Sequence, residues 1–217
     1  PSRYALLNAC ALLFFALSFL IRLSFLILDF TKVEHSLFSL LKIFFTGLFF
    51  DLGTVSFFYV VASLYFLFFP KRFYGSLLDR ILVYFGFSLA LLVVYFSFFA
   101  EITFWDEFQR RFNFIAVDYL IYTYEVVKNI NESYPLPLLI GGMVILVTTT
   151  VWLFARKGFF KKVFSTHDGF QVKLVPFLAA ILVVSFYTAS IDNDSAETSE
   201  NRYNNELSKA GIYSFFA

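Results

Sequence analysis

The sequence EITFWDEFQRRFNFIAVDYLIYTYEVVKNINESYP, residues 101–135, lies between two apolar runs and determines how the chain is divided. Residues 81–100 before it and 136–155 after it contain no charged side chain. Each of these runs is long enough to cross a bilayer, which takes about 20 apolar helical residues. The stretch between them carries acids and arginines, and its longest apolar part, residues 114–124, contains Asp118. It is therefore expected to stay at the membrane surface.

A helical period runs through this stretch. Large apolar side chains recur at alternating intervals of three and four residues: Trp105, Phe108, Phe112, Ile115, Tyr119, Tyr122 and Val126. This spacing places them on one face of a helix. The sequence predicts an amphipathic, interfacial helical segment over residues 101–135, between the third and fourth membrane spans.

Three more apolar runs, residues 5–28, 49–69 and 174–191, bring the predicted spans to five. Hydrophobic residues make up 59% of the 217 residues, a composition typical of helical membrane proteins. The first run is too long for a simple signal peptide and lacks a small-residue cleavage site. The predicted fold class is an all-α membrane protein with five transmembrane helices.

The distribution of Lys and Arg predicts the orientation. Basic residues gather in the connections 70–80 and 156–173, and Arg3 lies at the start of the chain. Because short cytoplasmic connections carry an excess of Lys and Arg, the N-terminus is expected in the cytoplasm and the C-terminus outside. The net charge of +1 gives no reason to expect a nucleic-acid partner.

Two segments outside the spans need separate interpretation. Residues 31–45 mix charges with leucines, which indicates either an outer amphipathic helix or a long extension of the second span. Residues 192–217 are polar until their apolar end, and a linker leaving the five-span domain (residues 1–191) is expected there. The aromatic end at residues 211–217 is read as the start of a further folded domain, so the chain is expected to be a fragment.

The surface stretch supplies the first set of candidate site residues. Arg110 and Arg111 can offer forked donors to a lipid phosphate. Asn113 and Asp118 can orient a polyol, and Tyr119 can lie at the interface. The alternative is structural. The arginines would then pair only with Asp106 and Glu107, four residues before them, and Asp118 would hold a turn.

Arg22 and Asp51 are the second set, because each is a lone charge within an apolar span. A charge inside a membrane costs about 2.5 to 3.5 kcal/mol on insertion scales, so the two are predicted to pair. Arg22 could instead extend toward the interface or meet Asp29. A transporter built on this pair is a weaker alternative.

No catalytic or metal-binding constellation is recognisable in the sequence. The single cysteine, Cys10, cannot form a zinc site, and His35 and His167 are predicted on opposite sides of the membrane. No phosphate-binding glycine loop or Ser-His-Asp set is found. Neither catalytic residues nor a cofactor are therefore assigned to this chain.

Residues 111–135, with FWDEFQ (104–109) before them, resemble the membrane domain of lipoteichoic acid synthase-like proteins. FFDLGT (49–54) and NRYNNELSKAGIYSFFA (201–217) share this resemblance. The family comprises phosphoglycerol transferases and sulfatase-like hydrolases of the alkaline phosphatase superfamily, which act on envelope lipids or glycans.

The resemblance implies a multi-pass protein of the bacterial cytoplasmic membrane. It implies a catalytic domain that follows the linker outside the cell and holds a divalent metal (Mn, Mg or Ca). The expected partners are the bilayer, a phosphatidylglycerol-like lipid and that catalytic domain. The alternative function is a non-enzymatic scaffold or transporter subunit whose outer segment binds a partner protein.

Overall fold

The computed structural model describes residues 3–113, 128 and 135–216, and these contain helices and connections but no strand. Five of the helices are long and apolar enough to cross a membrane: α1 (Ala5–Leu28), α2 (Leu37–Phe68), α3 (Leu77–Phe108), α6 (Leu136–Arg156) and α8 (Phe170–Ser190). Short helices join or follow them: η1 (Phe30–Lys32), η2 (Lys71–Phe73), α7 (Phe159–Ser165), η3 (Asn193–Ala196), α9 (Arg202–Ser208) and α10 (Gly211–Phe216). For the described residues, the prediction of an all-α fold with five helices of membrane-spanning length is confirmed.

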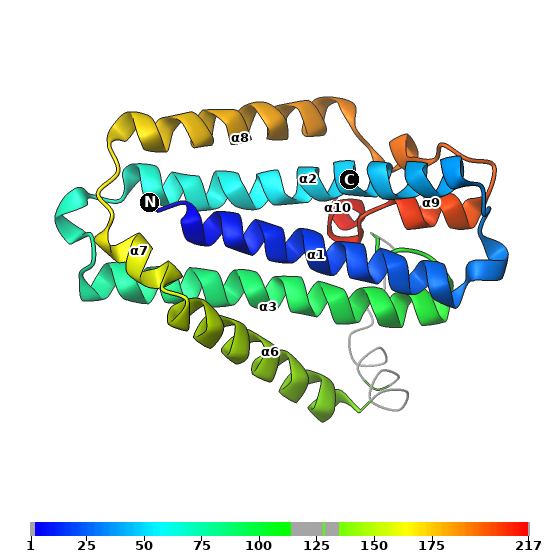
Figure 1. The fold of residues 1–217 in the computed structure, drawn as a ribbon, viewed down its shortest axis with the longest axis horizontal. Helices are drawn as coiled ribbons and strands as arrows, with labels where there is room; N and C mark the ends of the chain where they lie inside the picture. Colours follow the sequence, from blue (N-terminus) through cyan, green and yellow to red (C-terminus); the bar gives the residue numbers. More distant parts are fainter. Residues whose placement is uncertain (1–2, 114–127, 129–134, 217) are drawn as a thin grey trace.

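Helix α1 contacts α2 and α3, and these three helices form the centre of the bundle (Figure 1). Helix α8 lies along α2, and α6 packs on α3 and diverges from the others toward its N-terminal end. Large apolar side chains such as Leu12, Val61, Phe85, Ile145 and Leu182 remain exposed on the outer faces. Exposed apolar faces of this kind are compatible with lipid as the surrounding solvent.

Helices α2 and α3 are longer than one bilayer crossing requires. Each has 32 residues, or about 48 Å at 1.5 Å per residue. Ser36 caps the start of α2, where its side chain accepts a hydrogen bond from the Ser39 amide at 3.1 Å. Residues 37–45 therefore extend the second span, which is the second of the two interpretations of residues 31–45.

One end of the bundle gathers the N-terminus and both basic connections. Arg3 Nη2 donates to Asp79 Oδ1 at 2.6 Å, and the Arg3 amide donates to Asp168 Oδ2 at 2.8 Å. Tyr65 also donates its hydroxyl to Asp79, at 2.7 Å. We call this end of the bundle the basic end.

If a hydrocarbon layer of about 30 Å begins at the basic end, about 20 residues of each helix lie within it. About 12 residues at the start of α2 and about 12 at the end of α3 then extend beyond this layer at the opposite end. We call the described residues there, 29–48, 97–113 and 191–216, the cap. Figure 1 shows α9 and α10 within it, beside α1, α2 and α3. Arg22 and Asp51 lie at its base, within about one helical turn of the edge of the layer.

The prediction of a linker over residues 192–217 is corrected for residues 202–216. Helices α9 and α10 pack against the spans, and Leu207 and Ala210 are fully buried there. The buried polar side chains of Asn204, Glu206 and Lys209 find partners inside the cap, so their polarity does not force the segment into water. Within the described chain, the segment belongs to the packed membrane domain.

The prediction of a separate interfacial helix over residues 101–135 is wrong for residues 101–108, which belong to α3. Residues 101–108 continue α3 without a break. The helix ends at Phe108 because Gln109 adopts a left-handed conformation, with φ of 52°. The rest of the predicted segment, apart from residues 109–113, 128 and 135, lies outside the described residues.

Candidate functional site

A buried ion pair joins the first two spans at the base of the cap. Arg22 Nη1 lies 3.2 Å from Asp51 Oδ2, and Ser18 Oγ donates to Asp51 Oδ1 at 2.7 Å. The pair predicted from the sequence is confirmed. Asp29, the alternative partner of Arg22, instead pairs with Lys32 at 2.6 Å and accepts from Trp105 Nε1 at 2.8 Å.

The same arginine also holds the C-terminal segment. Arg22 Nε donates to the Leu207 carbonyl at 2.8 Å, and Nη2 donates to the Lys209 carbonyl at 3.3 Å. A helix leaves its last carbonyls without intrahelical partners. Arg22 therefore satisfies backbone groups at the C-terminal end of α9 while it neutralises Asp51.

A glycine on α2 makes room for the Arg22 guanidinium. A Cβ atom at Gly47 would lie 2.1 Å from Arg22 Cζ, well inside van der Waals contact. The side chain of Arg22 thus lies directly against the backbone of α2. Position 47 is required to be small because the arginine passes across it toward α9.

A second buried ion pair joins the end of α3 to the residues that follow it. Arg111 Nη1 lies 2.9 Å from Glu101 Oε2, and the Arg111 amide donates to Glu206 Oε2 at 2.8 Å. Burial lowers the pKa of the Arg111 guanidinium below its ordinary value, and the charge of Glu101 opposes that shift. The segment that leaves α3 is therefore tied both to α3 and to α9.

This arrangement overturns two expectations for Arg111. It is 1% exposed, so it faces the protein interior and does not contact a lipid headgroup at the surface. It pairs with Glu101 and not with Glu107, because α3 ends at Phe108 and the four-residue helical spacing is lost. Arg110 is exposed, so headgroup contact there remains a prediction.

The other surface candidates are only partly within the described chain. Asn113 is half-buried, and Asp118 and Tyr119 lie outside the described residues. Of the described candidates, Arg110 is exposed and Arg111 is buried, so these two neighbours do not face one site. The residues that do converge at the base of the cap are Arg22, Asp51, Glu101, Arg111 and Glu206, which we call the ionic cluster.

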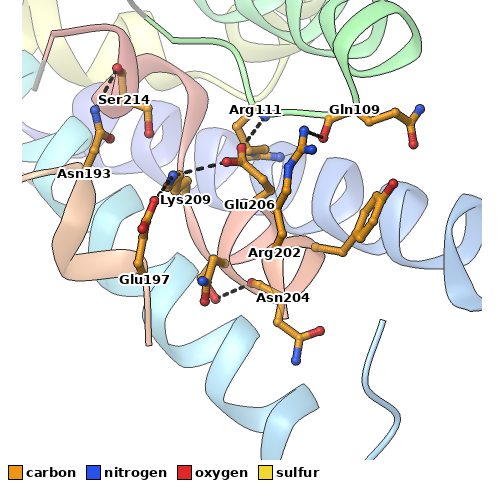
Figure 2. Close-up of polar contacts among 12 residues, drawn as sticks. Gln109, Arg111, Asn193, Glu197, Arg202, Asn204, Glu206, Lys209 and Ser214 are labelled. Carbon is orange, nitrogen blue, oxygen red and sulfur yellow. Dashed lines mark hydrogen bonds and ion pairs between the residues drawn. The ribbon is translucent and has the colours of Figure 1, made fainter. Parts of the chain in front are cut away.

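The C-terminal segment is also held by contacts of its own (Figure 2). Lys209 Nζ lies between Glu197 Oε1 at 3.0 Å and Glu206 Oε1 at 3.2 Å. Asn193 Nδ2 donates to the Ser214 carbonyl at 3.2 Å, and Arg202 Nη2 donates to the Gln109 carbonyl at 3.4 Å. Glu206 thus links Lys209 of the same segment to Arg111 after α3.

A small cavity lies inside the ionic cluster. Its volume is about 10 Å³, and its lining includes Ser18, Asp51, Ser97, Glu101 and Gly211. A space of this size with several polar groups can hold one water molecule. It is too small for a substrate or a cofactor, so the cluster is suited to holding structure together.

Gly211 provides a direct test of this packing. A Cβ atom there would lie 2.5 Å from Glu101 Cδ and Oε1. We expect Gly211→Ala to lower the free energy of unfolding by about 1 to 3 kcal/mol, the usual cost of overpacking. The measurement is an SDS unfolding titration of the purified chain. The control is Gly86→Ala, where an added Cβ meets nothing within 4 Å. Equal stabilities of the two variants would contradict the packing described.

Sequence reasoning missed three members of this arrangement. Glu101 follows an uncharged run and was read as the start of a surface segment, and Glu206 lies in a stretch read as a linker. Gly47 lies between the segment 31–45 and the predicted span 49–69. No local pattern marks these three, because their partners come from distant parts of the chain.

Comparison with known proteins does not assign the chain to a family. No family model, curated protein or solved structure matches it. The resemblance to lipoteichoic acid synthase-like proteins therefore gains no support from these comparisons. Among the described residues, no group of three or more His, Cys, Asp or Glu side chains could hold a metal ion.

Proposed function

We propose that this chain is a five-span membrane anchor that clamps residues 202–216 at the outer surface of the bacterial cytoplasmic membrane. The clamp fixes the position of the polypeptide that is expected to follow them. The resemblance noted in the sequence supports the further proposal that this polypeptide is an extracytoplasmic phosphoglycerol transferase or sulfatase-like hydrolase. Its divalent metal, and the phosphatidylglycerol-like lipid on which it acts, would belong to that domain.

The observation that supports the anchor role is the use of buried charges to hold α9. The Arg22 guanidinium on α1 donates to the Leu207 carbonyl, and the backbone amide of Arg111, beyond α3, donates to the buried Glu206 carboxylate. Buried charges are costly unless they are paired and hydrogen-bonded. These contacts fix α9 against the bundle, which a flexible tether does not require.

The orientation is supported by the grouping of basic residues. Arg3, Lys71, Arg72, Lys161 and Lys162 all belong to the N-terminal segment or to the two connections at the basic end. An excess of Lys and Arg favours the cytoplasmic side. The cap then faces outward, together with the clamped segment.

Cysteine labelling of the native protein in intact cells tests the orientation. In a Cys10→Ser background, Glu200→Cys in the cap should react with a membrane-impermeant maleimide without permeabilisation. Lys161→Cys at the basic end should react only after permeabilisation. Both native side chains are exposed. The reverse pattern of labelling would contradict the proposed orientation.

Intact mass and activity test the anchored enzyme. The native protein should be heavier than the 25.2 kDa of this chain by about one further domain. In that full-length protein, Gly211→Ala should lower turnover of phosphatidylglycerol in vesicles while turnover of a soluble phosphodiester is retained. Gly86→Ala is the matched control. A native mass near 25.2 kDa would contradict the proposed enzyme domain and favour a scaffold or transporter subunit.

A further inference from the structure

A second cavity lies within the cap, away from the ionic cluster. Its volume is about 240 Å³, and it opens between the start of α2 and residues 198–208; its lining includes Glu34, Phe38, Ser39, Lys42, Ser199, Asn204 and Ser208. Pockets for drug-sized ligands usually measure about 300 to 1,000 Å³. This cavity therefore suits a smaller polar group.

The polar wall of the cavity is held in place by neighbouring contacts. Asn204 is 2% exposed; its Oδ1 accepts from the Glu34 amide at 3.1 Å, and its Nδ2 donates to Glu34 Oε2 at 3.4 Å. Lys42 Nζ donates to the Thr198 carbonyl at 2.6 Å. That bond uses one of the three N–H donors of the lysine and leaves two for a ligand.

The two charges on this wall do not neutralise each other. Within the described residues, neither Lys42 nor Glu34 takes part in an ion pair, so their charged atoms are more than 4.0 Å apart. The neighbouring charges at Lys32 and Lys209 are already paired, with Asp29 and with two glutamates. Among the described residues, the positive and the negative group on this wall have no ion-pair partner, an arrangement complementary to a zwitterion.

An exposed apolar stripe leads along α2 to this cavity. It consists of side chains at intervals of three and four residues, all between 45% and 76% exposed: Phe38, Leu41, Phe45, Leu48 and Leu52. This spacing keeps the residues on one face of the helix. Leu52 lies in the part of α2 that a layer of about 30 Å measured from the basic end would cover, and Phe38 lies on the wall of the cavity. The stripe therefore forms a continuous path for an acyl chain from the bilayer to the polar cavity.

We infer that this cavity binds the headgroup of a zwitterionic phospholipid that carries a primary amine. Lys42 contacts the phosphate, Glu34 accepts hydrogen bonds from the ammonium group, and the acyl chains lie against the stripe on α2. A soluble zwitterion would satisfy the two charges but would leave the stripe uncovered. The inference does not depend on the anchor role, since it requires only that the cap lie at a membrane surface.

Native mass spectrometry of the chain in detergent tests this site with defined lipids. Phosphatidylethanolamine, phosphatidylglycerol and phosphatidylcholine with identical acyl chains are added separately. We expect retention of phosphatidylethanolamine to exceed that of phosphatidylcholine at least fivefold, because a quaternary amine donates no hydrogen bond to Glu34. Similar retention of all three lipids would overturn the inference.

Charge variants assign the two contacts separately. Lys42→Gln should lower retention of both phosphatidylethanolamine and phosphatidylglycerol at least fivefold. Glu34→Gln should lower phosphatidylethanolamine retention and raise that of phosphatidylglycerol, because it removes a carboxylate that repels an anionic headgroup. Lys161→Gln and Glu200→Gln, at exposed positions that do not line the cavity, are the matched controls. Equal effects of site and control variants would overturn the assignment.

The contribution of the acyl chains separates a lipid from a soluble ligand. Phe45→Ser should lower retention of phosphatidylethanolamine with the charges of the cavity intact. Soluble phosphoethanolamine at the same concentration should not displace the lipid. If it does, or if Phe45→Ser has no effect, the cavity is a site for a free zwitterion and the lipid assignment is wrong.

Discussion

Arg22→Gln is expected to lower the free energy of unfolding by about 3 to 5 kcal/mol, the range for removing one partner of a buried ion pair. The change leaves the buried carboxylate of Asp51 without its positive partner. It also removes donors from the carbonyls of Leu207 and Lys209. One substitution therefore weakens both the contact between α1 and α2 and the attachment of α9.

An SDS unfolding titration measures this effect, and a double variant supplies the control. In Arg22→Gln with Asp51→Asn neither member of this pair remains as an unpaired buried charge, so part of the lost stability should return. Arg156→Gln is the matched single control, because Arg156 is exposed at the end of α6 nearer the basic end. A loss below about 1 kcal/mol for Arg22→Gln would contradict a buried pair, since it would match exposed pairs.

Arg111→Gln is expected to lower the free energy of unfolding by a similar amount, about 3 to 5 kcal/mol. It leaves Glu101 buried and unpaired on α3. The Arg111 amide that donates to Glu206 is retained, so the C-terminal segment loses only part of its attachment. The main expected effect is loosening between the end of α3 and the rest of the cap.

The adjacent residue provides the control for this experiment. Arg110 has the same side chain but is exposed, so Arg110→Gln should change stability by less than about 0.5 kcal/mol. Limited proteolysis of residues 192–217 in both variants locates the effect. Faster cleavage in Arg111→Gln than in Arg110→Gln is the expected result. Equal cleavage and equal stability would show that Arg111 does not hold the cap together.

The five spans could be predicted because each is a local property of the sequence. Runs such as residues 81–100 and 136–155 are long, apolar and uncharged, and no distant contact is needed to recognise them. The pair between Arg22 and Asp51 could also be predicted, because an isolated charge in a span must find a partner. Composition was sufficient to predict the spans, and the cost of burying an unpaired charge was sufficient to predict the ion pair.

The structure of the cap could not be predicted in the same way. Residues 192–217 are polar until their apolar end, a pattern that predicts a linker, yet the Arg22 side chain and the Arg111 amide provide partners for α9. The helical spacing from Glu107 to Arg111 predicted an ion pair that the end of α3 at Phe108 prevents. Both errors have one cause: local patterns do not show which distant backbone groups and charges a folded chain supplies.

The central claim is that the C-terminal segment is clamped in the cap, and a distance measurement between two spin labels tests it most directly. In a Cys10→Ser background, labels replace Glu107 near the end of α3 and Phe216 at the end of α10, both exposed. A clamped segment predicts a single narrow distance distribution in lipid nanodiscs, which broadens when Arg22→Gln is added. A broad distribution in the chain that retains Arg22, unchanged by Arg22→Gln, would contradict the clamp.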